Sequence, residues 1–174
     1  MSSIGAQGKT WAPIYVQQRI VFMANVIISE KLIEINLAEK TKEAAIKVLA
    51  DKLKALDYVH EGYYENVIRR EKNFPTGLPT VIPIALCHTE REFVKKSALA
   101  VGTLKNPIEF QEMGTPDRNV KAEIIFLLAL NDPKDQVPWL QKMMTVFKSR
   151  EVMEKIKFAK DSKELAAYLK ELFA

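Results

Sequence analysis

The segment AEIIFLLAL, residues 122–130, is apolar at every position except Glu123. It is far shorter than the ~20 residues that a membrane-spanning helix needs. An apolar run of this length is instead typical of a strand that is buried on both faces of a sheet. Because such a strand needs a packing layer on each side, the segment predicts an α/β fold whose helices cover both faces of a central sheet.

Other strands and helices alternate along the rest of the chain. Residues 32–37 alternate between apolar and polar side chains, residues 81–86 are apolar throughout, and residues 97–101 and 107–110 each have the pattern of a separate strand. Helical spacing of apolar residues follows Thr41, Gly62, Pro133 and Asp161. This order predicts a single-domain α/β sandwich with a largely parallel, mixed sheet and helices on both faces.

In the third helical pattern, Val137, Leu140, Met144 and Phe147 are spaced to form one apolar side. Pro138 is expected in the first turn of this helix, where its missing N–H is tolerated. These four residues therefore predict a helix after Pro133.

A chain of 174 residues is long enough for one domain with a proper core. We assign residues 23–174 to that domain. Residues 1–22 show no clean period and contain Gly, Ser, Gln and Pro, so we interpret them as an N-terminal extension that need not be ordered.

Composition excludes several classes of protein. A single cysteine cannot form an internal disulfide, which favours a reducing compartment. The N-terminus lacks the apolar core of a secretory signal, so we expect a cytoplasmic protein without membrane insertion. The net charge of +4 is modest, and lysines alternate with glutamates instead of forming a basic stripe. We therefore expect no nucleic-acid partner.

Cys87 and His88 stand together at the end of the 81–86 strand. Successive residues of a strand point to opposite faces, so the two cannot form a nucleophile pair if the strand continues through them. Cys87 is expected to be a small buried hydrophobe. His60 is expected on the surface, and the spacing of His60, Cys87 and His88 matches no zinc site, so we expect no metal.

His88 lies where open α/β sheets place their ligand crevices, at the carboxyl end of a buried strand. A histidine there is a structural hydrogen-bonding group at least as often as a reactive one. Since no phosphate-binding glycine loop or carboxylate pair is found, a histidine with a nearby arginine favours phosphoryl acceptance over hydrolysis.

The stretches REKNFPTGL (70–78) and IALCH (84–88), followed by an apolar strand and a helix, resemble the enzyme IIA proteins of the sugar phosphotransferase system. The resemblance is to the fructose/mannitol superfamily and covers about residues 26–173. The FPTGL form is most similar to the galactitol-type branch and to related regulator-attached modules. The resemblance implies that His88 is the phosphorylated nucleophile and that Arg70 stabilises the phosphoryl group, with Thr76 as a secondary candidate that donates its hydroxyl.

Two features depart from the family pattern. Cys87 replaces the usual proline before the active histidine. The second histidine of mannitol-type members is absent, because residues 131–135 read NDPKD. With Lys134 expected near that place, a fixed positive charge should lower the pKa of His88; Glu90 is the neighbour that would raise it.

The resemblance also implies the partners. The phosphohistidine protein HPr would be the donor and a cysteine of a sugar-specific enzyme IIB the acceptor, with a membrane enzyme IIC in the same system and no cofactor. Two alternatives remain at this stage. One is a regulatory protein whose partner is controlled by phosphorylation of His88, and the other is a scaffold in which His88 is only structural.

Overall fold

The computed structural model describes residues 25–174, so the expected N-terminal extension, residues 1–22, lies outside the described residues. Within the described part of the chain, one mixed sheet contains strands β1 (Ile33–Leu37), β2 (Gly77–Leu78), β3 (Ile84–His88), β4 (Ala98–Glu112) and β5 (Thr115–Ala129). Its helices are α1 (Lys42–Ala55), α2 (Tyr63–Asn73), α3 (Pro133–Phe147), α4 (Arg150–Lys157) and α5 (Ser162–Phe173), with single turns η2 (Glu30–Leu32) and η3 (Arg91–Phe93).

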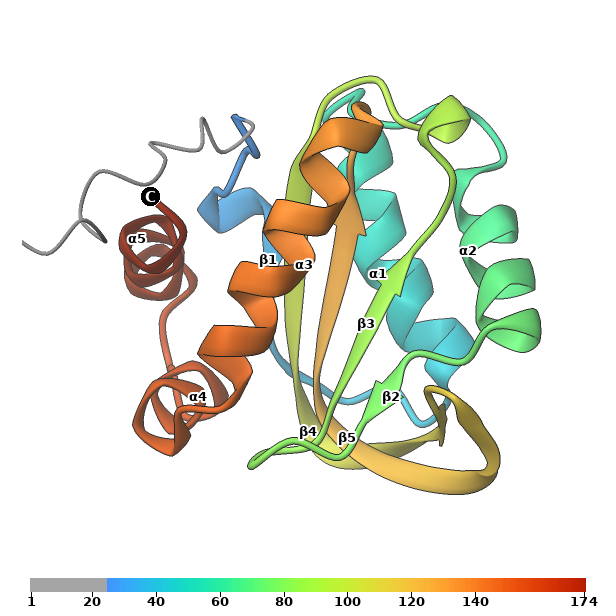
Figure 1. The fold of residues 1–174 in the computed structure, drawn as a ribbon. Helices are drawn as coiled ribbons and strands as arrows, with labels where there is room; N and C mark the ends of the chain where they lie inside the picture. The colour runs from blue at the N-terminus through green and yellow to red at the C-terminus, as the bar shows by residue number, and fades with distance from the viewer. Residues whose placement is uncertain (1–24) are drawn as a thin grey trace, which may run out of the picture.

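Helices α1 and α2 cover one face of the sheet, whereas α3, α4 and α5 cover the other (Figure 1). This arrangement confirms the expected α/β sandwich. Helix α4 was not expected from the sequence; it has eight residues, of which Met153 and Ile156 are buried. None of the helices in residues 25–174 is long and apolar enough to cross a membrane.

Strands β3 and β5 run parallel, with Ile84 opposite Ile124 and His88 opposite Leu128. Strands β1 and β4 are also parallel, whereas β4 and β5 form a long antiparallel hairpin from Ala98–Ala129 to Glu112–Thr115. Because β3 and β5 point the same way, both end at the same edge of the sheet. The segments that follow them are therefore brought together there.

The hairpin corrects one expectation. Residues 97–101 and 107–110 were predicted as separate strands, but residues 98–101 and 107–110 belong to the single strand β4, and its partner β5 begins at Thr115. The pairing shifts between Thr103 and Ile108, where residues 105–107 are exposed. A local irregularity of this kind accommodates Pro107, which cannot donate to the ladder, without ending the strand.

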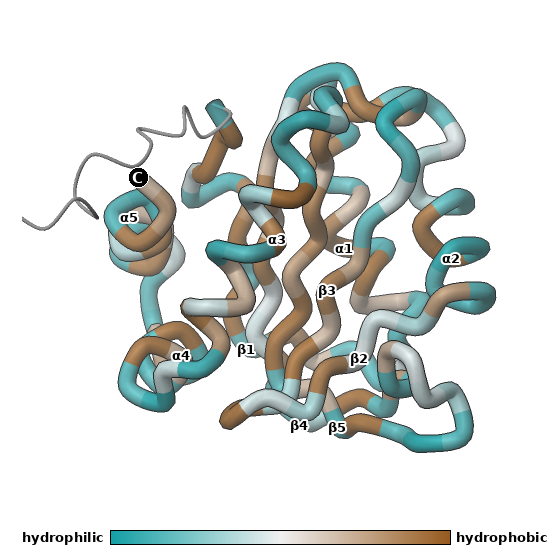
Figure 2. The backbone as a smooth tube through the Cα atoms, viewed as in Figure 1, coloured by the Kyte–Doolittle hydropathy of each residue, from teal (hydrophilic) through white to brown (hydrophobic). Residues whose placement is uncertain are grey.

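The two faces of the sheet have separate hydrophobic cores. On β3, Ala85 and Cys87 pack against the α1 and α2 side, and Ile84 and Leu86 against the α3, α4 and α5 side. Figure 2 shows hydrophobic residues concentrated along the strands, as a sheet covered on both faces requires. The period of two along β3 was correctly predicted through its last residue, His88.

Side chains at the helix starts explain several boundaries. The Thr41 hydroxyl accepts a hydrogen bond from the Ala44 amide at 3.2 Å, and the Asp161 carboxylate accepts one from the Glu164 amide at 2.8 Å, as N-caps do. The N-cap of α3 is Asp132, so the helix begins at Pro133. Pro138 was expected in the first turn but lies beyond it, inside the helix.

The buried side of α3 matches only in part the residues that predicted the helix. Trp139, Met143 and Phe147 are buried, whereas Val137 is 60% exposed and Met144 36% exposed. Both sets of residues fit helical spacing because α3 is apolar around much of its circumference, so the pattern alone could not choose between them.

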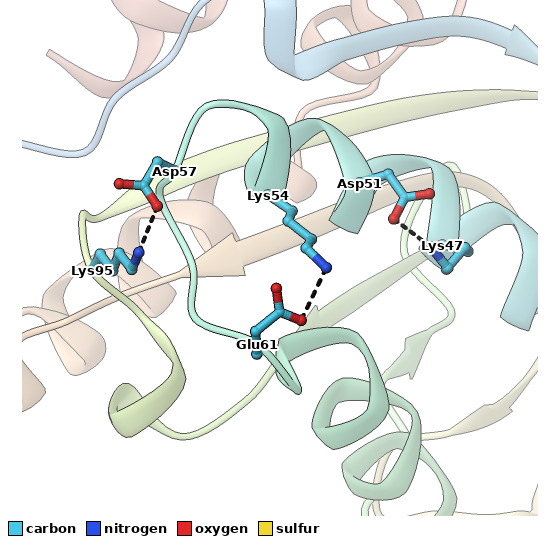
Figure 3. Close-up of polar contacts among 6 residues, drawn as sticks. All are labelled: Lys47, Asp51, Lys54, Asp57, Glu61 and Lys95. Carbon is cyan, nitrogen blue, oxygen red and sulfur yellow. Dashed lines mark hydrogen bonds and ion pairs between the residues drawn. The ribbon is translucent and has the colours of Figure 1, made fainter.

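Salt bridges on the surface connect the end of α1 to its neighbours (Figure 3). Lys47 pairs with Asp51 within α1, and Lys54 reaches Glu61 at 3.0 Å in the loop before α2. Asp57 pairs with Lys95, just ahead of β4, and this contact lowers the pKa of Asp57. All three pairs are solvent-exposed, so their contribution to stability is small.

Candidate functional site

His88 is the last residue of β3, on the same face as Ile84 and Leu86 and opposite to Cys87. Its Nδ1 atom lies 3.1 Å from the carbonyl oxygen of Leu86. A neutral ring satisfies this contact by donating its Nδ1–H, which leaves the lone pair of the ring on Nε2. The backbone of β3 therefore orients His88 with Nε2 as the available nucleophile.

A pocket of about 270 Å³ opens beside His88 at the edge of the sheet where β3 and β5 end. Five parts of the chain contribute to it: the end of α2, the end of β3, the loop that includes η3, the end of β5 and the start of α3. Its lining residues are Arg70, His88, Thr89, Glu90, Arg91, Glu92, Leu128, Leu130, Asp132, Pro133, Gln136 and Leu140.

Arg70 reaches this pocket from the last turn of α2. Its guanidinium lies over the ring of Phe74, with 5.6 Å from Cζ to the ring centroid, and its Nη1 is 3.5 Å from Glu90 Oε1. The Nε atom of Arg70 is buried and has no hydrogen-bond partner among residues 25–174. Buried donors are normally satisfied, so an unsatisfied one marks this guanidinium as a candidate group for binding a ligand.

Burial lowers the pKa of His88 below its ordinary value near 6.5. The hydrogen bond to Leu86 opposes that shift, the Arg70 guanidinium adds to it, and the Glu90 carboxylate opposes it. The ring is therefore neutral at neutral pH, the state in which imidazole is nucleophilic.

The pKa of His88 is lowered, as expected, but Lys134 is not the group that lowers it. Lys134 does not line the pocket; from its segment only Asp132 and Pro133 do so. The Asp132 carboxylate accepts a hydrogen bond from the Lys134 amide at 2.9 Å, because Asp132 caps α3. The fixed positive charge near His88 comes from Arg70 instead.

Thr76 is not brought to the pocket. It is 3% exposed, and its hydroxyl donates to Glu71 Oε2, while its amide donates to Glu71 Oε1 at 3.1 Å. Its hydroxyl also lies 3.7 Å from the Cys87 sulfur, on the side of β3 opposite to His88. The expectation that Thr76 donates to a phosphoryl group is corrected, because its hydroxyl is committed within the core.

The other residues considered from the sequence lie apart from the pocket. Cys87 is fully buried, and burial raises the pKa of its thiol well above the usual range, so it packs as a hydrophobe. His60 is exposed in the loop before α2, where its amide donates to the Phe93 carbonyl at 2.8 Å. Among residues 25–174, no three His, Cys, Asp or Glu side chains could hold a metal ion together.

Most residues that line the pocket were not predicted as site residues. They include Glu90, which was considered only as a rival neighbour of His88, and also Asp132 and Gln136. A signal for the last two was present in the sequence. Both follow the apolar 122–130 strand, and if that strand runs parallel to the one ending at His88, the two carboxyl ends meet. The parallel pairing of β3 and β5 supplies that step.

Comparisons with known proteins identify the family of this chain. The family model described as "Phosphoenolpyruvate-dependent sugar phosphotransferase system, EIIA 2" matches residues 26–172. The transcriptional regulator ManR of Bacillus subtilis (strain 168) is 34% identical over 85 residues, which are 49% of this chain and 12% of that protein. This chain therefore corresponds to a small part of the regulator.

Shorter relatives match along more of their length. The ascorbate-specific EIIA component of Escherichia coli (strain K12) is 24% identical over 141 residues, covering 80% of this chain and 89% of that protein. The galactitol-specific EIIA component of the same strain is 25% identical over 107 residues, covering 61% and 71% of the two chains.

Solved structures show the same fold. A putative PTS IIA (PtxA) of Streptococcus mutans superposes with a TM-score of 0.68 at 20% identity, covering 83% of this chain and 90% of that one. Enzyme IIA for mannitol of Escherichia coli, in complex with phosphorylated enzyme IIB, has a TM-score of 0.66 at 21% identity. The match covers 85% of this chain and 97% of that one. Because the family model spans residues 26–172 of the 174, the chain belongs to the EIIA 2 family of the phosphoenolpyruvate-dependent sugar phosphotransferase system.

Proposed function

We propose that His88 accepts a phosphoryl group from phosphorylated HPr and passes it to a cysteine of a sugar-specific enzyme IIB. Membership of the family makes the chain a phosphotransferase component and a phosphocarrier of a sugar phosphotransferase system. The observation that carries the residue assignment is the pocket itself, in which a histidine with a lowered pKa lies beside a guanidinium that has a buried, unpartnered donor.

The transfer needs only side chains that the pocket holds. In the first step the lone pair of His88 Nε2 attacks phosphorus, the P–N bond to the histidine of the donor breaks, and its electron pair stays on the donor nitrogen. In the second step a thiolate of the acceptor attacks phosphorus, the bond between phosphorus and His88 Nε2 breaks, and its electron pair stays on Nε2. Throughout, the Nδ1–H of His88 donates to the Leu86 carbonyl, which keeps the ring in one orientation.

Arg70 has the stabilising role in this proposal. A loose transition state spreads charge over the three equatorial oxygens of the phosphoryl group, so catalysis depends on alignment and on nearby donors. The guanidinium carries several N–H groups in a fixed plane, and the Phe74 ring packs against it. The Nε–H, which has no partner among the described residues, is the donor that the phosphoryl group would satisfy.

We extend the proposal to a system for galactitol or a related sugar, on the basis of the FPTGL stretch and of the galactitol-specific relative. The stretch has structural reasons for its sequence. Thr76 binds Glu71, and a Cβ atom on Gly77 would lie 2.6 Å from the Gln111 carbonyl oxygen, so only glycine fits. The galactitol part of the proposal therefore rests on the likeness of the stretch and on that relative, not on a contact in the pocket.

A regulatory role is the second candidate. The observation that favours it is the 34% identity to a segment of the transcriptional regulator ManR. In that case phosphorylation of His88 would change the binding of a target protein, with no onward transfer to an enzyme IIB. Both candidates place the protein in the cytoplasm, where HPr would meet it.

The test is incubation of the protein with enzyme I, HPr and phosphoenolpyruvate, followed by intact-mass measurement and mapping of the adduct. We expect one phosphoryl group, on His88, that is lost in acid, since a P–N bond on imidazole is acid-labile. An adduct that survives acid, or one that maps to His60, would contradict the proposal. Addition of enzyme IIB of the galactitol type then separates the candidates: a carrier loses the label to the IIB cysteine, whereas a regulator keeps it.

A further inference from the structure

The charged groups that line the pocket do not favour an anion. The carboxylates of Glu90, Glu92 and Asp132 face two guanidinium groups, those of Arg70 and Arg91, around a neutral His88. A site built only to hold a phosphoryl dianion would have an excess of positive charge. One carboxylate, that of Glu90, contacts the very guanidinium that the phosphoryl group needs.

We propose that Glu90 is a positioning residue that holds Arg70 while the pocket is empty and competes with the phosphoryl group for it afterwards. This inference rests on the proposed function and deepens it. Because of this competition, Arg70 stabilises the phosphoryl group on His88 only weakly, and the group is passed on. A carrier that bound the group too well would retain it, because only stabilisation specific to the transition state accelerates transfer.

The geometry suits a contact that can be exchanged. Glu90 Oε1 lies 3.5 Å from Arg70 Nη1, longer than a well-formed charge-assisted hydrogen bond. The two side chains are 46% and 28% exposed. The other carboxylate oxygen, Oε2, accepts the Thr89 hydroxyl at 2.6 Å, so the carboxylate stays beside His88 even if Arg70 turns away.

Arg70 is placed to change partners without leaving its position. Its packing against the Phe74 ring does not involve Glu90, and its Nε has no partner among the described residues. A phosphoryl oxygen can therefore take Nη1 from Glu90 while the guanidinium stays packed against Phe74.

The other charged side chains that line the pocket already have partners. Arg91 pairs with Glu92 at 3.6 Å on η3, and Asp132 accepts the Lys134 amide at the start of α3. The Thr89 hydroxyl is the main group that lowers the pKa of Glu90, with Arg70 and Arg69 adding to it, so Glu90 is ionised at neutral pH. Glu90 is thus the acid whose charge acts directly on Arg70.

The test uses inorganic phosphate as the probe and the imidazole NMR signals of His88 as the readout, on the unphosphorylated protein. We expect Glu90→Gln to bind phosphate about two- to fivefold more tightly than the parent, the range for loss of one partly exposed ion pair. Glu90→Asp keeps the charge and should fall between the two. Glu92→Gln is the matched control, because it removes the same charge from the same pocket but releases Arg91 instead of Arg70. Since Arg91 is 58% exposed and Arg70 only 28%, the control should change the affinity less.

A second measurement follows phosphorylated His88 after labelling through HPr. The label should be lost more slowly from Glu90→Gln, both to water and to enzyme IIB, than from the parent or from Glu92→Gln. Equal phosphate affinities for Glu90→Gln and the parent, or equal gains in Glu90→Gln and Glu92→Gln, would overturn the role of Glu90. Failure of HPr to label the parent would instead overturn the proposed function, and the phosphate titration would still decide the role of Glu90.

Discussion

Cys87 and His88 are neighbours on one strand, yet they belong to two polar clusters of opposite character. On the α1 and α2 side, Cys87 lies beside Thr76 and Glu71, and all three are buried. On the α3 side, His88 lines an open pocket with Arg70. The first cluster is closed and its acid has partners, whereas the second is open and has a buried donor without one.

The two clusters differ more in whether their buried polar atoms have hydrogen-bond partners than in the types of residue they contain. Both carboxylate oxygens of Glu71 accept hydrogen bonds from Thr76, so the buried acid has a structural explanation. The unpartnered Nε of Arg70 has no such explanation within residues 25–174, and a ligand supplies one. Burial moves both titrating groups toward their neutral forms, since it raises the pKa of Glu71 and lowers that of His88.

The largest expected effect separates the two neighbours directly. His88→Ala should lose all phosphorylation by HPr, because no other group in the pocket is a comparable nucleophile. Cys87→Ala should be labelled at the parent rate, because the thiol lies on the closed face. Intact mass after incubation with the donor measures both. Labelling of His88→Ala would break the comparison.

Arg70→Ala should slow transfer while leaving the fold intact. Loss of one charge-assisted contact to the phosphoryl group costs about 2–4 kcal/mol of barrier, or ~30- to 1000-fold in rate. Arg70→Lys should recover only part, since an ammonium cannot reproduce the planar fork. Rapid-quench transfer from HPr is the measurement, with circular dichroism to confirm folding. Transfer by Arg70→Ala at the parent rate would assign phosphoryl stabilisation to another residue.

Thr76→Val tests the closed cluster. The substitution leaves the buried Glu71 carboxylate with one hydrogen bond fewer, which should lower the free energy of unfolding by about 1–3 kcal/mol. The rate of phosphoryl transfer per folded molecule should not change, because Thr76 does not line the pocket. Urea denaturation and transfer kinetics on the same preparation distinguish the two effects. A stable variant with slow transfer would restore the catalytic role first inferred from the sequence.

The smallest effect is on the titration of His88. Its midpoint in the folded protein should lie below that in the urea-unfolded chain, because burial disfavours the imidazolium. The unfolded state then binds more protons between the two midpoints, so the contribution of His88 to stability falls as pH drops through about 6.5. Arg70→Ala should raise the midpoint and Lys134→Ala should leave it unchanged. NMR of the imidazole signals checks both, and a midpoint above the unfolded value would contradict burial as the main cause.

The local pattern of the sequence determined much of this protein. The period of two along residues 84–88 placed His88 and Cys87 on opposite faces, and the side chains of Thr41 and Asp161 fixed the starts of two helices. The stretches around Arg70 and His88 also carried the resemblance to the family that the comparisons confirm. These features depend on neighbours within a few residues, so they can be inferred before any tertiary contact is known.

Only the tertiary structure decided which residues share the pocket. The parallel pairing of β3 with β5 brings Asp132 and Gln136 to the pocket of His88. Thr76 does not line this pocket, whereas Glu90 does and contacts Arg70. The same holds for α3, where two apolar sides compete and packing against the sheet chose Trp139 over Val137. Long-range packing settles such choices because the sequence spacing permits both solutions, and only one of them fills the space beside the sheet.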